Sequence, residues 1–319
     1  MNFLEELEQL RLKTPRIHNI NIGSENSDYC THSDKNKNCY LLFAANFNED
    51  CLYGGIVLNS RDCMDINYCE YSELCYDCLD IDHCYNCMTS QDLKNCSDCK
   101  FCYDCVGCQN CFGCVGLRQK QYHFFNEPLS KEEYEKRIAA YDFKNRETWK
   151  QIFPPFIDLM KKIPRRAAHL TQSENCTGEF VIRSKNCFAC FDAHESQDCF
   201  YLQDVWRTKD SADLTFSDGT ELCYECFSLG LGCYNCNFCN FIRGCSDCEY
   251  CELCFNCKHC FGCVGLQSKE FYILNQPYSR EDYFKKVAEI KAQMRAEGAY
   301  GKHLPTTYKY EDTAAVYWK

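Results

Sequence analysis

The sequence predicts a mainly β protein built from two tandem β-solenoid-like ladders of 12-residue coils, each followed by a capping amphipathic α-helix. Three observations lead to this fold class. The chain of 319 residues contains two similar copies, its 32 cysteines recur at intervals of three and twelve, and a helix start signal follows each cysteine-rich stretch. We therefore divide the chain into 1–149, 150–298 and a C-terminal tail, 299–319.

The duplication is visible in one heptapeptide. CFGCVGL occurs at 111–117 and again at 260–266, an offset of 149, and the match continues through KQYHFFNEPLSKEEY against KEFYILNQPYSREDY. Thirteen of the 16 cysteines in each copy coincide if one residue is inserted in the second copy between Cys226 and Cys233. Because thirteen is odd, the shared cysteines cannot divide wholly into disulfides or wholly into groups of four. Some of them must serve packing.

The cysteines of the first copy keep a strict register. Asp or Asn often precedes the register cysteine, as at Asp50, and an apolar residue often follows it, as at Leu52, which indicates a turn and then a short strand. Successive coils would stack into columns. A 24-residue coil would give two alternating columns instead, and a helical stripe is disfavoured by Gly107, Gly113 and Gly116. The register cysteines are Cys39, Cys51, Cys63, Cys75, Cys87, Cys99 and Cys111.

A helix is predicted after each ladder. Ser130 with Glu133, and Ser279 with Asp282, have the spacing of capping boxes, and apolar residues at helical spacing follow both. Such helices would close the open end of a ladder. Between the copies, the double proline of 152–164 predicts a broken linker helix.

Charge restricts the class of partner. The net charge is −11, and the ladders carry most of it: 12 acidic against 3 basic residues over 39–117, and 12 against 4 over 187–266. Such a surface repels phosphate backbones, so we expect no direct nucleic-acid binding. The N-terminus is acidic and amphipathic, unlike a secretory signal, and no apolar run is long enough to span a bilayer. We expect a cytoplasmic protein whose thiols stay reduced.

Four thiols within one coil of each copy are the candidate metal ligands. Paired Cys-x-x-Cys chelates are the usual way to hold tetrahedral zinc, and no histidine is shared between the copies, so a duplicated site would be all thiolate. An iron-sulfur cluster, a column of reduced buried thiols, and disulfides remain alternatives. The candidate ligands are Cys99, Cys102, Cys105 and Cys108, and Cys248, Cys251, Cys254 and Cys257.

No set of residues with catalytic spacing is present, so we expect no enzyme activity. In CFGCVGL, the Asn-x-Pro-x-Ser segment that follows it and the tail YKYEDTAAVYW, the chain resembles a family of cysteine-rich repeat proteins from candidate-phylum, small-genome bacteria. The resemblance implies a bacterial, cytoplasmic setting and gives no site residues. Our hypothesis is a zinc-stabilised scaffold that presents an acidic, aromatic surface to a protein partner, and the alternative is an iron-sulfur or thiol-redox electron-transfer protein.

Overall fold

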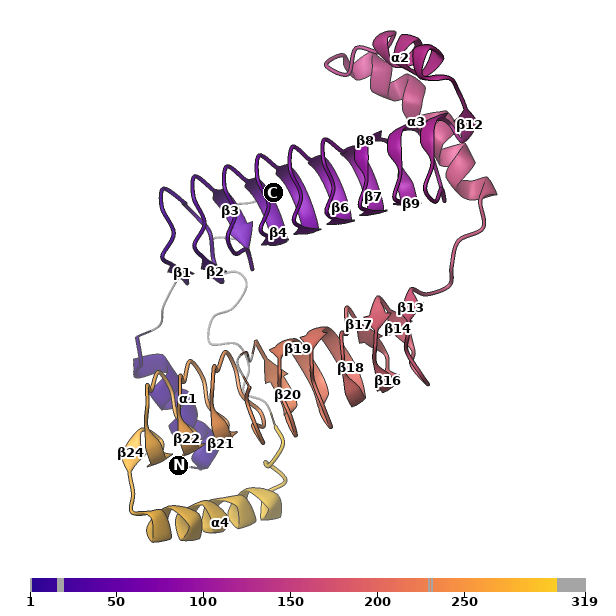
Figure 1. The fold of residues 1–319 in the computed structure, drawn as a ribbon. Coiled ribbons are helices and arrows are strands. Elements are labelled where there is room, and N and C mark those ends of the chain that lie inside the picture. The colour runs from indigo at the N-terminus through magenta and orange to yellow at the C-terminus, as the bar shows by residue number, and fades with distance from the viewer. Residues whose placement is uncertain (1, 16–19, 229, 231, 303–319) are drawn as a thin grey trace. The chain divides into compact units, whose positions relative to one another are not determined.

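A computed structural model describes residues 2–15, 20–228, 230 and 232–302 (Figure 1). The fold is mainly β, and most of its strands pair in parallel. The chain forms two compact units, one of residues 17–165 and one of residues 1–16 with 166–319. Each unit contains one stack of strands. We call them ladder 1 (residues 21–128) and ladder 2 (residues 170–277).

Ladder 1 is followed by two helices, α2 (Lys131–Ala139) and α3 (Arg146–Lys162). Its strands are β1 (Asn21–Ile22), β2 (Ser33–Asp34), β3 (Tyr40–Phe43), β4 (Leu52–Leu58), β5 (Met64–Glu70), β6 (Tyr76–Asp82), β7 (Met88–Lys94), β8 (Ser97–Lys100), β9 (Tyr103–Val106), β10 (Gln109–Phe112), β11 (Gln121–Phe124) and β12 (Glu127–Pro128).

Ladder 2 is followed by α4 (Arg280–Ala296), and α1 (Phe3–Lys13) belongs to the same unit. Its strands are β13 (Leu170–Thr171), β14 (Gly178–Glu179), β15 (Val181–Ile182), β16 (Lys185–Phe188), β17 (Cys190–Phe191), β18 (Gln197–Trp206), β19 (Ala212–Asp218), β20 (Tyr224–Phe227), β21 (Ser246–Glu249), β22 (Lys258–Phe261), β23 (Glu270–Ile273) and β24 (Gln276–Pro277).

The pairing register of ladder 1 is twelve residues. Tyr40 lies beside Leu52, Leu52 beside Met64, and Cys99 beside Cys111. We call each 12-residue segment a rung. The register cysteines from Cys39 to Cys111 contact one another in sequence, so the predicted column is unbroken. This register excludes a 24-residue coil and a helical stripe.

Turns occur four times per rung, where the sequence indicated one. Every third residue has positive φ, as at Asn38, Leu41, Ala44 and Phe47, with φ values of 53°, 57°, 51° and 59°. The residue after each such corner points inward, because inward positions are buried three residues apart. A rung therefore has four short sides, and this geometry explains why all cysteines of the first copy fall on one phase of three.

Ladder 2 departs from twelve residues in two places. The predicted insertion appears as a 13-residue rung, in which Glu221 pairs with Tyr234. An 11-residue rung, in which Leu170 pairs with Val181, is a compensating deletion that the sequence comparison did not reveal. Gly178 lies in this short rung with φ of +134°, where a Cβ atom would stand 1.7 Å from the Cys190 carbonyl oxygen. Glycine is required there.

The helices after the two ladders begin at the predicted residues, whereas the helix that links the copies differs from the prediction. Ser130 caps α2 through a capping box with Glu133, and Ser279 accepts the Asp282 backbone N–H at the start of α4. The helix α3 is continuous through its two prolines, and the prediction of a broken helix is wrong. Ile152 and the residues near it bury against ladder 1, which offsets the lost backbone hydrogen bonds. No helix in the described part of the chain has the length and apolar character to cross a membrane.

The compact units do not follow the predicted division into 1–149 and 150–298. The helix α3, from the start of the second copy, packs on ladder 1, and α1, from the start of the first copy, packs on ladder 2. Each boundary therefore lies about one helix further along the chain. Of the predicted tail, residues 299–302 are described and 303–319 lie outside the described residues.

Candidate functional site

Inward-pointing thiols form most of the interior of both ladders. Every cysteine except Cys176 is buried, and all are free thiols in the structure. They share the interior with small or branched apolar residues such as Leu42, Ala45 and Val57. A side of three residues leaves little space inside a rung, so small inward residues are favoured there.

The thiols are hydrogen-bonded to the backbone. In most rungs Sγ donates to the carbonyl two residues before it or to the carbonyl nine residues after it, which lies on the next rung. Cys99 Sγ lies 3.4 Å from the Ser97 oxygen and 3.6 Å from the Cys108 oxygen, and Cys251 Sγ lies 3.4 Å from both of its acceptors. A neutral thiol is a weak donor that suits these positions. Burial raises the pKa of Cys102 and Cys251 well above the ordinary thiol value, which favours the neutral form.

The predicted tetrads lie within single rungs but do not form separate clusters. The Cys99 thiol contacts Cys102 within its rung, and it also contacts Cys87 and Cys111 in the neighbouring rungs. The second tetrad repeats this pattern, because Cys248 contacts Cys251 as well as Cys236 and Cys260. Thiol contacts thus extend along the ladder, whereas a tetrahedral metal site needs four sulfurs around one point.

Metal ligation does not fit this arrangement as it stands. Across the residues that the structure describes, no group of three or more His, Cys, Asp or Glu side chains is placed to hold a metal ion. The thiols are instead directed to carbonyl oxygens. Zinc or an iron-sulfur cluster at the eight predicted cysteines stays a prediction that metal analysis must test.

Buried Asn and Ser side chains form a column in line with the columns of thiols. The sequence comparison did not reveal it. Asn48 Nδ2 donates to the Val57 oxygen at 2.7 Å and to Asn36 Oδ1 at 3.0 Å, and its own Oδ1 accepts the Ser60 backbone N–H at 2.9 Å. Ser60 Oγ then accepts the Ser72 backbone N–H. These inward Asn and Ser residues lie at intervals of twelve, and this spacing could have identified the column from the sequence.

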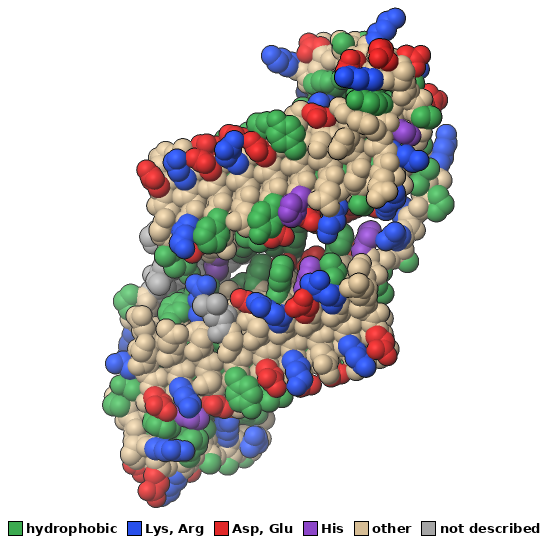
Figure 2. Space-filling model, viewed as in Figure 1, with side chains coloured by type: hydrophobic (Ala, Val, Ile, Leu, Met, Phe, Trp, Pro, Cys, Tyr) green, Lys and Arg blue, Asp and Glu red, His purple; other side chains and the backbone are tan. Residues whose placement is uncertain are grey.

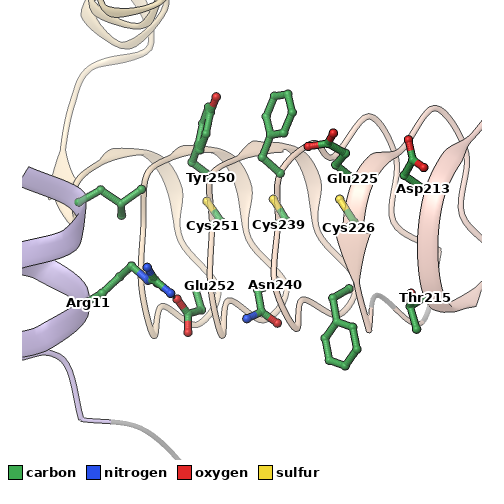
Figure 3. Close-up of a pocket in the computed structure, with 13 residues that line it drawn as sticks. Arg11, Asp213, Thr215, Glu225, Cys226, Cys239, Asn240, Tyr250, Cys251 and Glu252 are labelled. Carbon is green, nitrogen blue, oxygen red and sulfur yellow. Dashed lines mark hydrogen bonds and ion pairs between the residues drawn. The ribbon is translucent and has the colours of Figure 1, made fainter. Parts of the chain in front are cut away.

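One side of ladder 2 forms a groove. Figure 3 shows Cys226, Cys239 and Cys251 in line between two rims. Asp213, Glu225 and Tyr250 form one rim, and Thr215, Asn240 and Glu252 form the other (Figure 3). Its volume is about 520 Å³, and Leu7 and Arg11 of α1 close one end. We call it the acidic-aromatic groove of ladder 2.

The same side of ladder 1 carries grooves at equivalent positions. One, of about 350 Å³, is bounded by Asp65, Asp77 and Tyr103 and is closed by Phe156 of α3. A second, of about 560 Å³, adjoins it at Asp65 and includes Phe43 and Tyr53. Together they form the acidic-aromatic groove of ladder 1.

Several rim residues match between the two grooves. On other sides of the ladders, oppositely charged side chains on successive rungs form ion pairs, such as Lys37–Glu49 and Arg61–Glu73. Figure 2 shows basic and acidic side chains alternating along the ladders. Charges paired in this way attract partners weakly. At an offset of 148, the rim carboxylates Asp65 and Asp77 match Asp213 and Glu225. The rings of Phe43 and Tyr53 match the exposed Phe191 and Tyr201, which lie on the same side of ladder 2 outside its groove.

Comparisons with known proteins show no family. No protein-family model matches the chain, and no curated protein matches it. Among solved structures, a putative acetyltransferase from Desulfovibrio desulfuricans G20 is 9% identical, with 70% of this chain and 59% of that chain covered and a TM-score of 0.14. UDP-N-acetylglucosamine acyltransferase from Campylobacter jejuni is 8% identical, with 92% of both chains covered and a TM-score of 0.11. This chain thus spans less than two thirds of the Desulfovibrio protein. TM-scores this low carry no argument about fold or activity.

Proposed function

We propose that the chain is a non-enzymatic, cytoplasmic scaffold of two β-solenoids, which binds a protein partner through the acidic-aromatic grooves. The 12-residue register and the four corners per rung support the solenoid architecture. The resemblance to cysteine-rich repeat proteins of candidate-phylum bacteria agrees with a bacterial setting for this role. In this proposal the thiols build the core as neutral packing groups, and zinc is a separate prediction.

The observation that carries this role is the pattern of carboxylates and exposed rings that the two ladders share on one side. Tyr53 and Tyr201 are 45% and 61% exposed, and Phe43 and Phe191 are 37% and 49% exposed, at equivalent places in both ladders. On ladder 1, Tyr53 contacts Tyr40 and Phe43 contacts His32, and both residues still leave more than a third of their surface exposed. Exposed aromatic residues are typical of binding surfaces, since they offer large contact area at small entropic cost.

The carboxylates of the same rims indicate the chemistry of the partner. Asp65 and Asp77 on ladder 1 and Asp213 on ladder 2 are exposed, and Glu225 lines the ladder 2 groove together with Asp213. A protein segment that carries Lys or Arg together with apolar side chains would complement both the charge and the rings. Extended surfaces of solenoids commonly bind partners in this way.

Charge reversal tests the role. The rim variant carries Asp65→Lys, Asp77→Lys, Asp213→Lys and Glu225→Lys, and the control carries Asp50→Lys, Asp62→Lys, Asp198→Lys and Asp210→Lys, which occupy corners with the same positive φ. Tagged chains would be recovered from cells and their bound proteins identified by mass spectrometry. We expect a partner bound by the wild type and the control to be lost from the rim variant. A partner that both variants keep, or that both lose, would contradict the groove as its site.

The electron-transfer alternative has a distinct signature. Iron with a broad visible absorption band in the purified chain would support it, whereas zinc without colour would support a metal-stabilised scaffold. Elemental analysis with a visible spectrum separates the two.

A further inference from the structure

Each ladder ends in an aromatic seat that holds a helix. On ladder 1, Ile152 and Phe156 of α3 pack with Phe101 and Phe112. On ladder 2, α1 provides the helix, and it lies against the rungs of β21 and β22 (Figure 1). The Phe3 ring centroid is 4.7 Å from that of Phe261.

The two seats are equivalent residue by residue. Gly116 would meet Ile163 if it had a Cβ atom, and Gly265 would meet Thr14 in the same way. The helices α1 and α3 therefore occupy the same place on their ladders. At the offset of 149, the matched members of the two clusters are Phe3 and Ile152, Leu7 and Phe156, Phe101 and Tyr250, Phe112 and Phe261, Val115 and Val264, and Tyr134 and Tyr283.

The seats differ in where their helix comes from. Ladder 1 is held by a helix that follows it directly in the chain. Ladder 2 is held by a helix from the other end of the chain, and Arg11 and Glu252 are 241 positions apart in the sequence. The seat of ladder 2 thus recognises α1 by its side chains, without a short connection to hold it there.

A buried ion pair is part of this recognition. Arg11 Nε lies 2.8 Å from a Glu252 carboxylate oxygen, and the two residues are 7% and 6% exposed. Met160 and Tyr103 stand at the equivalent positions on ladder 1, so the pair is particular to the seat of ladder 2. Arg11 also pairs with Glu8 of its own helix at 2.9 Å. Reversing the charge at either position of the buried pair sets like charges against each other in the seat, so this pair discriminates between matching and mismatching helices.

We propose that the seat of ladder 2 also binds α1 of a second copy of this chain, giving dimers in which the N-terminal helices are exchanged. An exchanged helix makes the same contacts as the chain's own helix, so no contact is lost by exchange. The balance between the closed monomer and the dimer is then set by chain concentration. Arg11 and Glu252 also line one end of the acidic-aromatic groove of ladder 2, but the exchange rests on the contacts between helix and seat and does not require a partner in the groove.

Reversing each charge separately tests the exchange. Arg11→Glu alone and Glu252→Arg alone place like charges together in the seat, whether the helix comes from the same chain or from an identical one. When the two variants are mixed, each helix matches the seat of the other chain. We expect native mass spectrometry of the mixture, refolded together, to show one-to-one heterodimers that neither variant gives with itself.

The double variant, Arg11→Glu with Glu252→Arg, is the control, because its helix again matches its own seat. It is expected to fold as a monomer at low concentration. A mixture that gives no heterodimer while the double variant folds would overturn the proposal. If the double variant does not fold, wild-type chains refolded with mass-tagged wild-type chains decide instead: mixed dimers at high concentration support exchange, and monomers at every concentration overturn it.

Discussion

The corner residues set the chemistry of the rungs. Positive φ costs an ordinary residue about 1–2 kcal/mol, and Asn and Asp tolerate it best, which accounts for Asn38, Asp50 and Asp62 at successive corners. The side chain after each corner points into a narrow interior, which favours small or branched residues, and many of these side chains hydrogen-bond a nearby carbonyl. Cysteine suits both conditions as a small hydrophobe with a weak donor, so geometry alone accounts for many of the cysteines.

The metal question is settled by single replacements in the first tetrad. If the thiols only pack, the variants Cys99→Ser, Cys102→Ser, Cys105→Ser and Cys108→Ser should each lower the free energy of unfolding by about 1–3 kcal/mol with no change in metal content. Denaturant titration and elemental analysis of the five chains measure both. Loss of about one zinc equivalent in every variant would instead establish the predicted site.

The buried amide of Asn48 should be costly to replace. Asn48→Leu leaves the Ser60 N–H without this partner, whereas the Val57 oxygen still accepts the Asn46 backbone N–H at 3.0 Å. An unsatisfied buried group costs about 1–3 kcal/mol, so we expect the free energy of unfolding to fall by about that amount in denaturant titration. Gln109→Leu, at an exposed strand position, should change it by less than about 0.5 kcal/mol. Equal effects would show that the amide is not structural.

Asp192 should make ladder 2 sensitive to pH. Burial raises the pKa of this carboxyl to about 7, and the charges of Asp204 and Glu179 add to the effect. Because the folded pKa lies above the unfolded value of about 3.9, the folded state binds the proton more tightly, and stability falls as pH rises from about 4 to about 7. Asp192→Asn should remove this slope. The free energy of unfolding of both chains would be measured between pH 4 and 8. If it changes with pH equally in the two chains, Asp192 is not the cause.

For the secondary-structure elements, periodicity predicted the repeating rungs and the 13-residue rung, and it missed the 11-residue rung. The column from Cys39 to Cys111 and the caps at Ser130 and Ser279 follow from local spacing, and the structure has them. The 11-residue rung shortens the spacing from Cys176 to Cys187 to eleven, and the offset between the copies changes from 149 at Ser24 to 148 at Cys39, so this signal was present in the sequence and was not used. The grooves could not be predicted either. Only when each rung is known to have four sides of three residues can Asp65 and Tyr53 be placed on the same side.

Gly178 should control the short rung. Gly178→Ala places a Cβ atom against the Cys190 carbonyl and strains φ, so we expect a loss of more than about 3 kcal/mol in the free energy of unfolding. Gly219→Ala has positive φ of +62° and a nearest neighbour at 3.9 Å, so it should lose only about 1–2 kcal/mol. Hydrogen exchange of β14 and β17 would locate the damage. Equal losses in the two variants would show that the carbonyl contact is unimportant.

At the scale of the whole molecule, the copies in the sequence and the units in the structure are offset by one helix. Alignment at 149 residues identifies equivalent positions, but it cannot say which helix covers which ladder. The apolar faces of α1 and α3 match both seats equally in pattern, so only contacts such as Phe3 with Phe261 assign them. The division predicted from sequence therefore separates each ladder from the helix in its seat, α3 or α1, although α2 and α4 stay with their ladders.

This offset makes the two halves unequal when they are separated. Residues 17–165 contain ladder 1 with α2 and α3, so this fragment keeps every member of its aromatic cluster and should unfold cooperatively. Residues 166–302 lack α1, and Phe261, Tyr250 and Tyr283 lose the side chains that cover them. Burying an aromatic side chain contributes about 1.5–3 kcal/mol, so this fragment should be less stable by several kcal/mol. Attaching residues 2–15 to its C-terminus through a flexible linker should restore it, and the same addition with Leu7→Asp should not. Denaturant titration of the four fragments measures this, and a stable 166–302 fragment without the helix would contradict the assignment of α1 as its cap.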